Sequence, residues 1–111
     1  MAAGTYNFTI EQGTTFNRVL TLQENGSAMN LTGYSVASQM RSTHDSSSII
    51  ATFTGTVSNA SSGQITLSLT NSQTSAIEEA IYVYDVEITS GTGTVTRILE
   101  GNITVTPEVT R

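Results

Sequence analysis

The chain of 111 residues contains no cysteine, no tryptophan and no lysine. Without cysteine, disulfide bonds, thiolate zinc sites and cysteine nucleophiles are excluded together. A small domain without disulfides must be stabilised by its hydrophobic core or by partners. The single histidine, His44, leaves too few nitrogen ligands for a typical transition-metal site.

Positive charge is scarce, and this limits the class of partner. Four arginines (Arg18, Arg41, Arg97 and Arg111) oppose nine acidic residues, which gives a net charge of −5. A nucleic-acid interface needs a basic footprint to neutralise phosphates, and an anionic membrane surface attracts basic segments. The composition therefore argues against both kinds of partner.

Long apolar runs are also missing. No stretch approaches the roughly 18 residues of a membrane span. Residues 1–5 lack the basic and apolar regions of a signal peptide. We therefore expect one domain over residues 1–111, synthesised in a cytoplasm and not exported by a signal peptide.

Threonine and serine dominate what is present, often in alternation with apolar residues. Threonine is β-branched and suits the half-buried surface of a pleated sheet. The expected strands cover residues 5–10, 15–22, 34–41, 48–57, 64–69, 81–89 and 94–105. Val19 breaks the alternation of the second strand, which suggests a bulge or a partly covered second face there. A sheet face rich in hydroxyl groups is less protected against association with another chain than a charged face is. We therefore expect these faces to be buried in an assembly.

Seven or so short strands with turns between them predict an all-β fold, a single antiparallel β-sandwich with Ig-like architecture. The disulfide and buried tryptophan of true immunoglobulin domains are absent. One short helix is expected near residues 71–79, with Asn71 or Ser72 as its N-cap. The following strand carries inward Tyr82 and Tyr84, which are either plain core tyrosines or the tyrosine corner of such sandwiches.

The last two strands predict a long hairpin whose turn is residues 90–93. In that register Thr89 faces Thr94 and Val86 faces Arg97, which places Arg97 on the apolar face. Two interpretations follow for this arginine. It extends outward from a sheet edge, or it pairs with an acid of a neighbouring subunit. The acids Asp85 and Glu87 are expected on the other face.

Candidate catalytic groups have simpler explanations. His44 and Asp45 are neighbours in a serine-rich loop, whereas a catalytic triad forms by spatial convergence. Glu78 and Glu79, with the acids of the next strand, could serve glycoside hydrolysis, but the tryptophan that often lines sugar clefts is missing. No loop has the ligand spacing of a calcium site. We expect no enzymatic activity, no cofactor, no metal site and no small-molecule substrate.

Three short motifs follow one another in the C-terminal sequence. Residues 82–87 end in Tyr-Asp-Val-Glu, residues 97–101 read Arg-Ile-Leu-Glu-Gly, and residues 107–111 read Pro-Glu-Val-Thr-Arg. This order resembles a family of small virion proteins of tailed bacteriophages, which often end in a Tyr-Asp-(Leu/Val)-Glu strand followed by Arg-(Leu/Ile)-Leu-x-Gly and then Pro-Glu-Val-Thr-Arg. Residues 10–16 and 30–41 are similar as well, so the resemblance spans nearly the whole chain.

This family looks like the Ig-like N-terminal domain of phage baseplate upper proteins. The resemblance implies a non-enzymatic virion structural protein, an adaptor or decoration module that docks to tail, neck or baseplate proteins and to copies of itself. The alternatives are a receptor- or carbohydrate-binding module of a phage fibre, with loops 42–48 and 58–63 as its binding end, and a head decoration protein. The expected location is the phage particle. The interface candidates are Arg97, Pro107, Glu108, Val109, Thr110 and Arg111.

Overall fold

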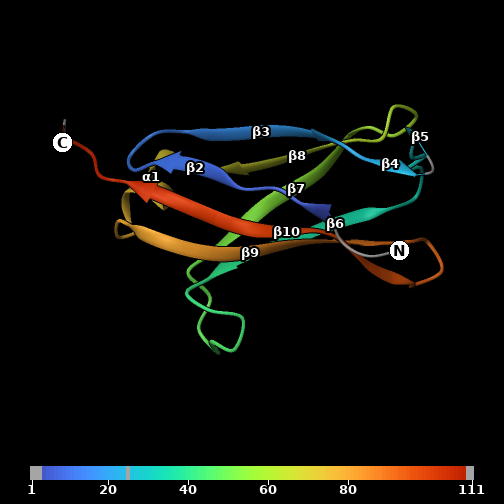
Figure 1. Cartoon of the computed structure of the whole chain (residues 1–111). Coiled ribbons are helices and arrows are strands. Elements are labelled where there is room, and N and C mark those ends of the chain that lie inside the picture. The colour runs from blue at the N-terminus through green and yellow to red at the C-terminus, as the bar shows by residue number, and fades with distance from the viewer. Residues whose placement is uncertain (1–3, 25, 110–111) are drawn as a thin grey trace.

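The computed structural model describes residues 4–24 and 26–109 (Figure 1). In these ranges the elements are β1 (Gly4–Thr5), β2 (Phe8–Glu11), β3 (Phe16–Thr21), β4 (Gln23–Glu24), β5 (Ser27–Ala28), β6 (Ser35–Arg41), β7 (Ala51–Asn59), β8 (Gln64–Leu69), α1 (Asn71–Ser75), β9 (Ala80–Thr89) and β10 (Val95–Thr106). The all-β prediction is confirmed, and each strand of four or more residues lies where alternation predicts one. No helix in the described ranges is long and apolar enough to cross a membrane.

The main sheet has the strand order β1-β10-β9-β6-β7-β8-β3, with β2 also paired to β10. Strand β7 belongs to both halves, because its first residues pair with β6 and the rest pair with β8. The sheet therefore curls around β7 into a half-barrel, whose two halves face each other across the core (Figure 1). Strands β4 and β5 form a separate small hairpin.

The sheet is mixed, so the prediction of a purely antiparallel arrangement is wrong. Both β1 and β2 run parallel to β10. The N-terminal segment lies along the outer edge of the last strand and follows its direction. Alternation in the sequence shows which side chains face inward, but it carries no information about which strand lies alongside or in which direction.

Inward-facing residues form one core between the two halves of the sheet. Phe8 and Phe16 stack with ring centroids 5.3 Å apart, and Tyr84 meets Phe8 edge-on at 5.0 Å. In β8 the buried residues are Ile65, Leu67 and Leu69, as the alternation predicts. Val19 is 57% exposed, and β3 pairs with β8 without a register shift. The predicted bulge at this residue is therefore wrong, and its side chain simply points outward.

Helix α1 confirms the predicted helix, although it is shorter and begins differently. Its N-cap is Thr70, neither Asn71 nor Ser72, and a capping box joins Thr70 to Gln73. The Thr70 hydroxyl accepts from the Gln73 backbone amide at 3.2 Å, while the Gln73 side chain accepts from the Thr70 amide at 2.8 Å. This reciprocal pairing satisfies two backbone donors and ends β8 sharply.

Tyr82 closes the connection between α1 and β9. Its ring is buried, and its hydroxyl donates to the Glu78 carbonyl oxygen at 2.6 Å, four residues upstream. Such a bond at the entry to a strand is the geometry of a tyrosine corner. The bond fits both predicted interpretations, because a buried core tyrosine also needs a partner for its hydroxyl.

Replacing Tyr82 with phenylalanine should lower the free energy of unfolding by about 0.5–1.5 kcal/mol, because the partly buried hydrogen bond to the Glu78 carbonyl is lost. Urea unfolding followed by circular dichroism measures this loss. Tyr34→Phe is the matched control, since no side-chain bond to another described residue is present at its hydroxyl. Equal stability of the two variants would show that the corner bond contributes nothing.

Candidate functional site

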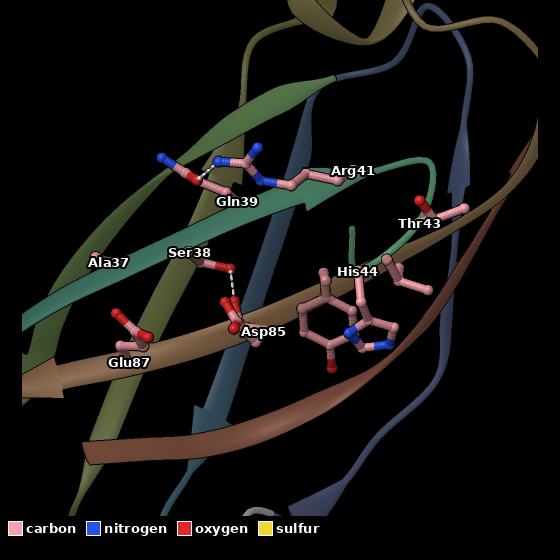
Figure 2. Close-up of a pocket in the computed structure, with 10 residues that line it drawn as sticks. Ala37, Ser38, Gln39, Arg41, Thr43, His44, Asp85 and Glu87 are labelled. Atoms are coloured by element: carbon pink, nitrogen blue, oxygen red, sulfur yellow. Dashed lines mark hydrogen bonds between the residues drawn. The ribbon is translucent and has the colours of Figure 1, made fainter. Parts of the chain in front are cut away.

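The outward-facing side chains of β6 and β9 line a hollow with a volume of about 300 Å³ (Figure 2). The alternation that points Ser38 and Met40 inward turns Gln39 and Arg41 outward. The lining residues are Ala37, Ser38, Gln39, Arg41, Thr43, His44, Val83, Tyr84, Asp85 and Glu87. Carboxylate, amide, guanidinium and imidazole groups therefore surround one concavity.

Arg41 anchors the loop that borders this hollow. Its guanidinium donates to the Ser46 carbonyl oxygen at 2.8 Å and to the Gln39 side-chain oxygen at 2.9 Å. The Ser46 amide in turn donates to the Thr43 carbonyl oxygen at 3.2 Å. The strand therefore holds loop 42–47 through a charged group that is itself partly buried.

His44 extends from this loop over the outer face of the sheet (Figure 2). It also lines a second hollow of about 200 Å³, together with Thr5, Asn7, Glu100, Gly101 and Asn102. The imidazole therefore lies between two concavities that follow the same face from β6 to β10. Asp45, its neighbour, is exposed. Loop 58–63 lies at the opposite end of the sheet (Figure 1), so it cannot share a binding end with loop 42–48.

Arg97 lies on this outer face, so the predicted placement on the apolar face is wrong. It is opposite Glu87 in the hairpin, and its side chain is 54% exposed. The guanidinium lies 3.5 Å from an Asp85 carboxylate oxygen and 3.2 Å from one of Glu100. Asp85, which was expected on the other face, is therefore an intramolecular partner.

The length of the hairpin loop causes this difference. The loop contains one more residue than predicted, so Thr89 pairs with Val95, and the Ser90 amide donates to the Thr94 carbonyl oxygen at 2.9 Å. One residue of slip exchanges the two faces, so Arg97 lies opposite Glu87 and points outward. A bulge between Arg97 and Leu99 then moves the register by a second residue, which returns the residues after it to their predicted faces.

The C-terminal segment leaves the fold beside α1 (Figure 1). The Glu108 backbone amide donates to the Gln12 side-chain oxygen at 3.1 Å, and the amide nitrogen of the same side chain donates to the Ile77 carbonyl oxygen at 2.8 Å. Gln12 thus joins the tail to the end of the helix. Pro107 is exposed and Val109 is 92% exposed. The other two predicted interface residues, Thr110 and Arg111, lie outside the described residues.

The chemistry of the face is that of polar recognition. Ser38 is buried, and its hydroxyl donates to the Asp85 backbone carbonyl at 2.7 Å, so it supports the sheet and faces no substrate. Among residues 4–24 and 26–109, no cluster of three or more histidine or acidic residues could hold a metal ion. The sequence prediction missed Gln39 and Arg41. These residues could have been found from the alternation of β6, which turns both side chains outward just before a polar loop.

Tyr84 forms part of the floor of the larger hollow, and its hydroxyl donates to the Tyr6 backbone carbonyl. Burial raises the pKa of Tyr84 well above the ordinary value of 10.0; Tyr6 raises it further, and the Arg18 charge partly offsets both. The pKa of Tyr82 is also raised, by burial and then by Glu78. Both hydroxyls therefore remain protonated in the folded protein at pH values where the unfolded chain ionises.

This difference predicts a loss of stability in alkali. A tyrosine whose pKa is higher in the folded protein than in the unfolded chain stabilises the fold fully at pH values below the unfolded pKa, which is near 10. This contribution to stability is lost as the pH rises through the pKa of the folded state. For Tyr84 the slope should stay below about 1.4 kcal/mol per pH unit, because only one proton is released from this hydroxyl. Urea unfolding between about pH 8 and 11.5 measures it. Tyr84→Phe should flatten the slope, whereas an unchanged slope would contradict this assignment.

Comparison with known proteins adds no relative to this description. No protein-family model matches the sequence, and no curated protein matches it.

Proposed function

We propose that the chain is a non-enzymatic structural protein of a bacteriophage particle, which docks onto other tail, neck or baseplate proteins. One observation carries the proposal: the segment that resembles the virion family is a continuous structural unit. It forms the central hairpin β9–β10 and continues into an outward tail. The tail is held at Glu108 and exposes Val109, which suits a segment that contacts a neighbouring protein.

The half-barrel is proposed to be an Ig-like sandwich. Three features support this finer description. The consecutive strands β2 and β3 lie in different halves of the sheet, each on its own side of the aromatic cluster. The Tyr82 hydroxyl makes the corner bond that such sandwiches share. The last two strands are neighbours, with β6 next to β9.

Docking is proposed to use two surfaces. The first is the tail, with Pro107, Glu108 and Val109. The second is the outer face around Arg97, whose ion pairs with Asp85 and Glu100 are exposed and can exchange for contacts with a partner. Exposed ion pairs contribute about 1 kcal/mol or less to folding, so these charges remain available for recognition.

The test is the imaging of purified particles from the phage that encodes the chain. Copies of the protein are expected at symmetric positions, and deletion of residues 107–111 should remove them. The isolated deletion variant should still unfold in a single cooperative transition, because the tail lies outside the core and, among the described residues, donates one hydrogen bond to the fold, from the Glu108 amide to Gln12. Ser61→Ala, in the loop at the opposite end of the sheet, is the matched control and should leave incorporation unchanged. Particles that contain no copies of the unaltered chain would refute the proposal.

A second candidate is a receptor- or carbohydrate-binding module, favoured by the hollow beneath loop 42–47. Gln39, Arg41 and Glu87 offer donors and acceptors of the kind that sugar hydroxyls need. If the isolated domain bound glycans on an array and Glu87→Gln abolished this binding, the second function would be established. Absence of binding, with particle incorporation intact, would favour the adaptor.

A further inference from the structure

Strand β3 is the terminal strand of the sheet, and one of its edges is open. It pairs with β8 over six residues without interruption. On the other side, no strand of the described residues pairs with it. The next strand in space, β2, pairs with β10 instead and meets β3 through side chains: the Phe8 ring stacks on Phe16 and lies beneath the Arg18 guanidinium (Figure 1).

The hydrogen-bond pattern shows which backbone groups face the open edge. The Leu22 amide donates to the Gly63 carbonyl oxygen at 2.7 Å, and these residues continue the register of the β3–β8 ladder. In an antiparallel pair the hydrogen-bonded residues alternate along each strand. Phe16, Arg18 and Leu20 therefore bond to β8. The free N–H and C=O groups belong to Asn17, Val19 and Thr21.

This edge lacks most of the usual protections against strand addition; the exception is Arg18, a charge that points into the half-barrel. Natural edges are blunted by charges, proline, bulges or short length. Here Asn17, Val19 and Thr21 are exposed and uncharged, and the six-residue strand is regular. The opposite edge of the sheet is less regular, because β1 and β2 are separated by Tyr6 and Asn7.

The charge distribution favours a second copy of this chain as the occupant. The net charge of −5 would normally oppose self-association. However, strands β3, β7 and β8 contain no acidic residue, and their single charge is Arg18. All nine acids lie outside these three strands. Two copies can therefore meet along β3 without bringing carboxylates together.

We propose that β3 pairs in antiparallel orientation with β3 of a second copy, about a two-fold axis at Val19. This register places Val19 opposite its own symmetry mate and Asn17 opposite Thr21 of the second copy. It uses every free backbone group of the strand, which amounts to about six new hydrogen bonds. Arg18 then faces Leu20 of the second copy, so the two guanidinium groups do not oppose each other.

Pairing along one edge buries less surface than a permanent interface does, so the dimer is concentration-dependent. Within a particle, where copies are held close together, the same contact is strengthened by effective concentration. The inference is independent of the proposed virion role, because it concerns the isolated protein.

Sedimentation velocity at increasing protein concentration tests the pairing. The unaltered chain should show a monomer–dimer equilibrium. Val19→Lys should raise the dissociation constant about tenfold or more, because two lysines would face each other across the axis. Ile81→Lys is the matched control: it also replaces an exposed branched side chain, 67% exposed, but on a strand paired on both sides. It should leave the equilibrium unchanged.

Disulfide trapping fixes the register, and the natural absence of cysteine makes it specific. Opposed residues in an antiparallel pair lie within disulfide reach. Val19→Cys should cross-link to itself under mild oxidation. Asn17→Cys should cross-link only when mixed with Thr21→Cys. An unaltered chain that stays monomeric at every concentration would overturn the proposal, as would dissociation by Ile81→Lys with Val19→Lys still dimeric.

Discussion

Gly101→Ala is expected to lower the free energy of unfolding by about 2–3 kcal/mol, the usual cost of forcing an atom into a packed position. A Cβ atom at residue 101 would lie 2.3 Å from the Tyr6 carbonyl oxygen and 2.7 Å from the Asn7 side-chain oxygen. The nearest obstacle is backbone, which cannot rotate away as a side chain can. The segment that joins β1 to β2 must therefore move off β10.

The displaced segment carries several of the contacts that hold the N-terminus. The Tyr6 amide donates to the Glu100 carbonyl oxygen at 3.0 Å, and the Asn102 amide donates to the Asn7 side-chain oxygen at 2.8 Å. The Tyr84 hydroxyl donates to the same Tyr6 carbonyl that the new methyl group would strike. Gly101→Ala and Tyr84→Phe should therefore be less than additive, because each disrupts the same acceptor.

Gly91→Ala is the matched control for this substitution. The nearest heavy atom to its added Cβ is a Gly33 oxygen at 3.8 Å, an ordinary contact distance. The stability change should stay within about 0.5 kcal/mol. Urea unfolding of both variants gives the comparison. If Gly101→Ala were as stable as Gly91→Ala, the N-terminal strands would not be held against β10 in the way described.

The positions of the strands could be predicted from the sequence because burial imposes a period of two. In β9, inward Tyr82, Tyr84, Val86 and Ile88 alternate with outward residues, and this alternation depends on local spacing alone. The short helix was also predictable, from its polar start and helix-forming residues. The predicted N-caps, Asn71 or Ser72, lie one or two residues too late, because Thr70, Asn71 and Ser72 are all suitable caps and only the capping box distinguishes them.

Pairing could not be predicted in the same way. The hairpin loop is one residue longer than predicted, and the bulge after Arg97 changes the register again, through the non-local fit between β9 and β10. The sequence thus identified Arg97 as the charged residue to test, yet assigned it to the wrong face. The same limit applies to β1 and β2, whose parallel pairing with β10 depends on where the N-terminal chain enters. Alternation shows which residues of one strand share a face, but it does not show which strand lies alongside or in which register.

The candidate site was partly predictable for a related reason. The tail residues Pro107 and Val109 were identified through the resemblance, and the structure leaves both exposed. The hollow beneath loop 42–47 was not predicted, because it depends on Arg41 bonding to Ser46 and thereby drawing the loop over the sheet. A loop conformation held by one side chain has no periodic signature in the sequence.

Arg18 carries the second large effect that we expect, since it is a charged residue pointing into the half-barrel. Its guanidinium carbon lies 5.6 Å from the Phe8 ring centroid and 5.8 Å from that of Phe16, and it donates to the Tyr6 hydroxyl at 2.9 Å. Among the described residues no carboxylate lies within ion-pair distance of it. The two aromatic faces and one hydroxyl therefore stabilise this cation.

Arg18→Ala should lower the free energy of unfolding by about 2–4 kcal/mol, through the lost cation–π contacts, the lost hydrogen bond and the lost packing of the arginine stem. Arg41→Ala is the matched control: it removes a partly buried arginine that holds only a loop, and should cost about 1 kcal/mol. Urea unfolding of the two variants measures the difference.

Arg18→Met separates the charge from the packing. Methionine keeps much of the volume between the rings of Phe8 and Phe16 but has neither the positive charge nor the donor for Tyr6. If the cation stabilises the junction between β2 and β3, Arg18→Met should remain about 1–2 kcal/mol less stable than the unaltered protein. A methionine variant of equal or higher stability would mean that the cost of desolvating the guanidinium outweighs these contacts, and that the aromatic stack alone joins the two halves of the sheet.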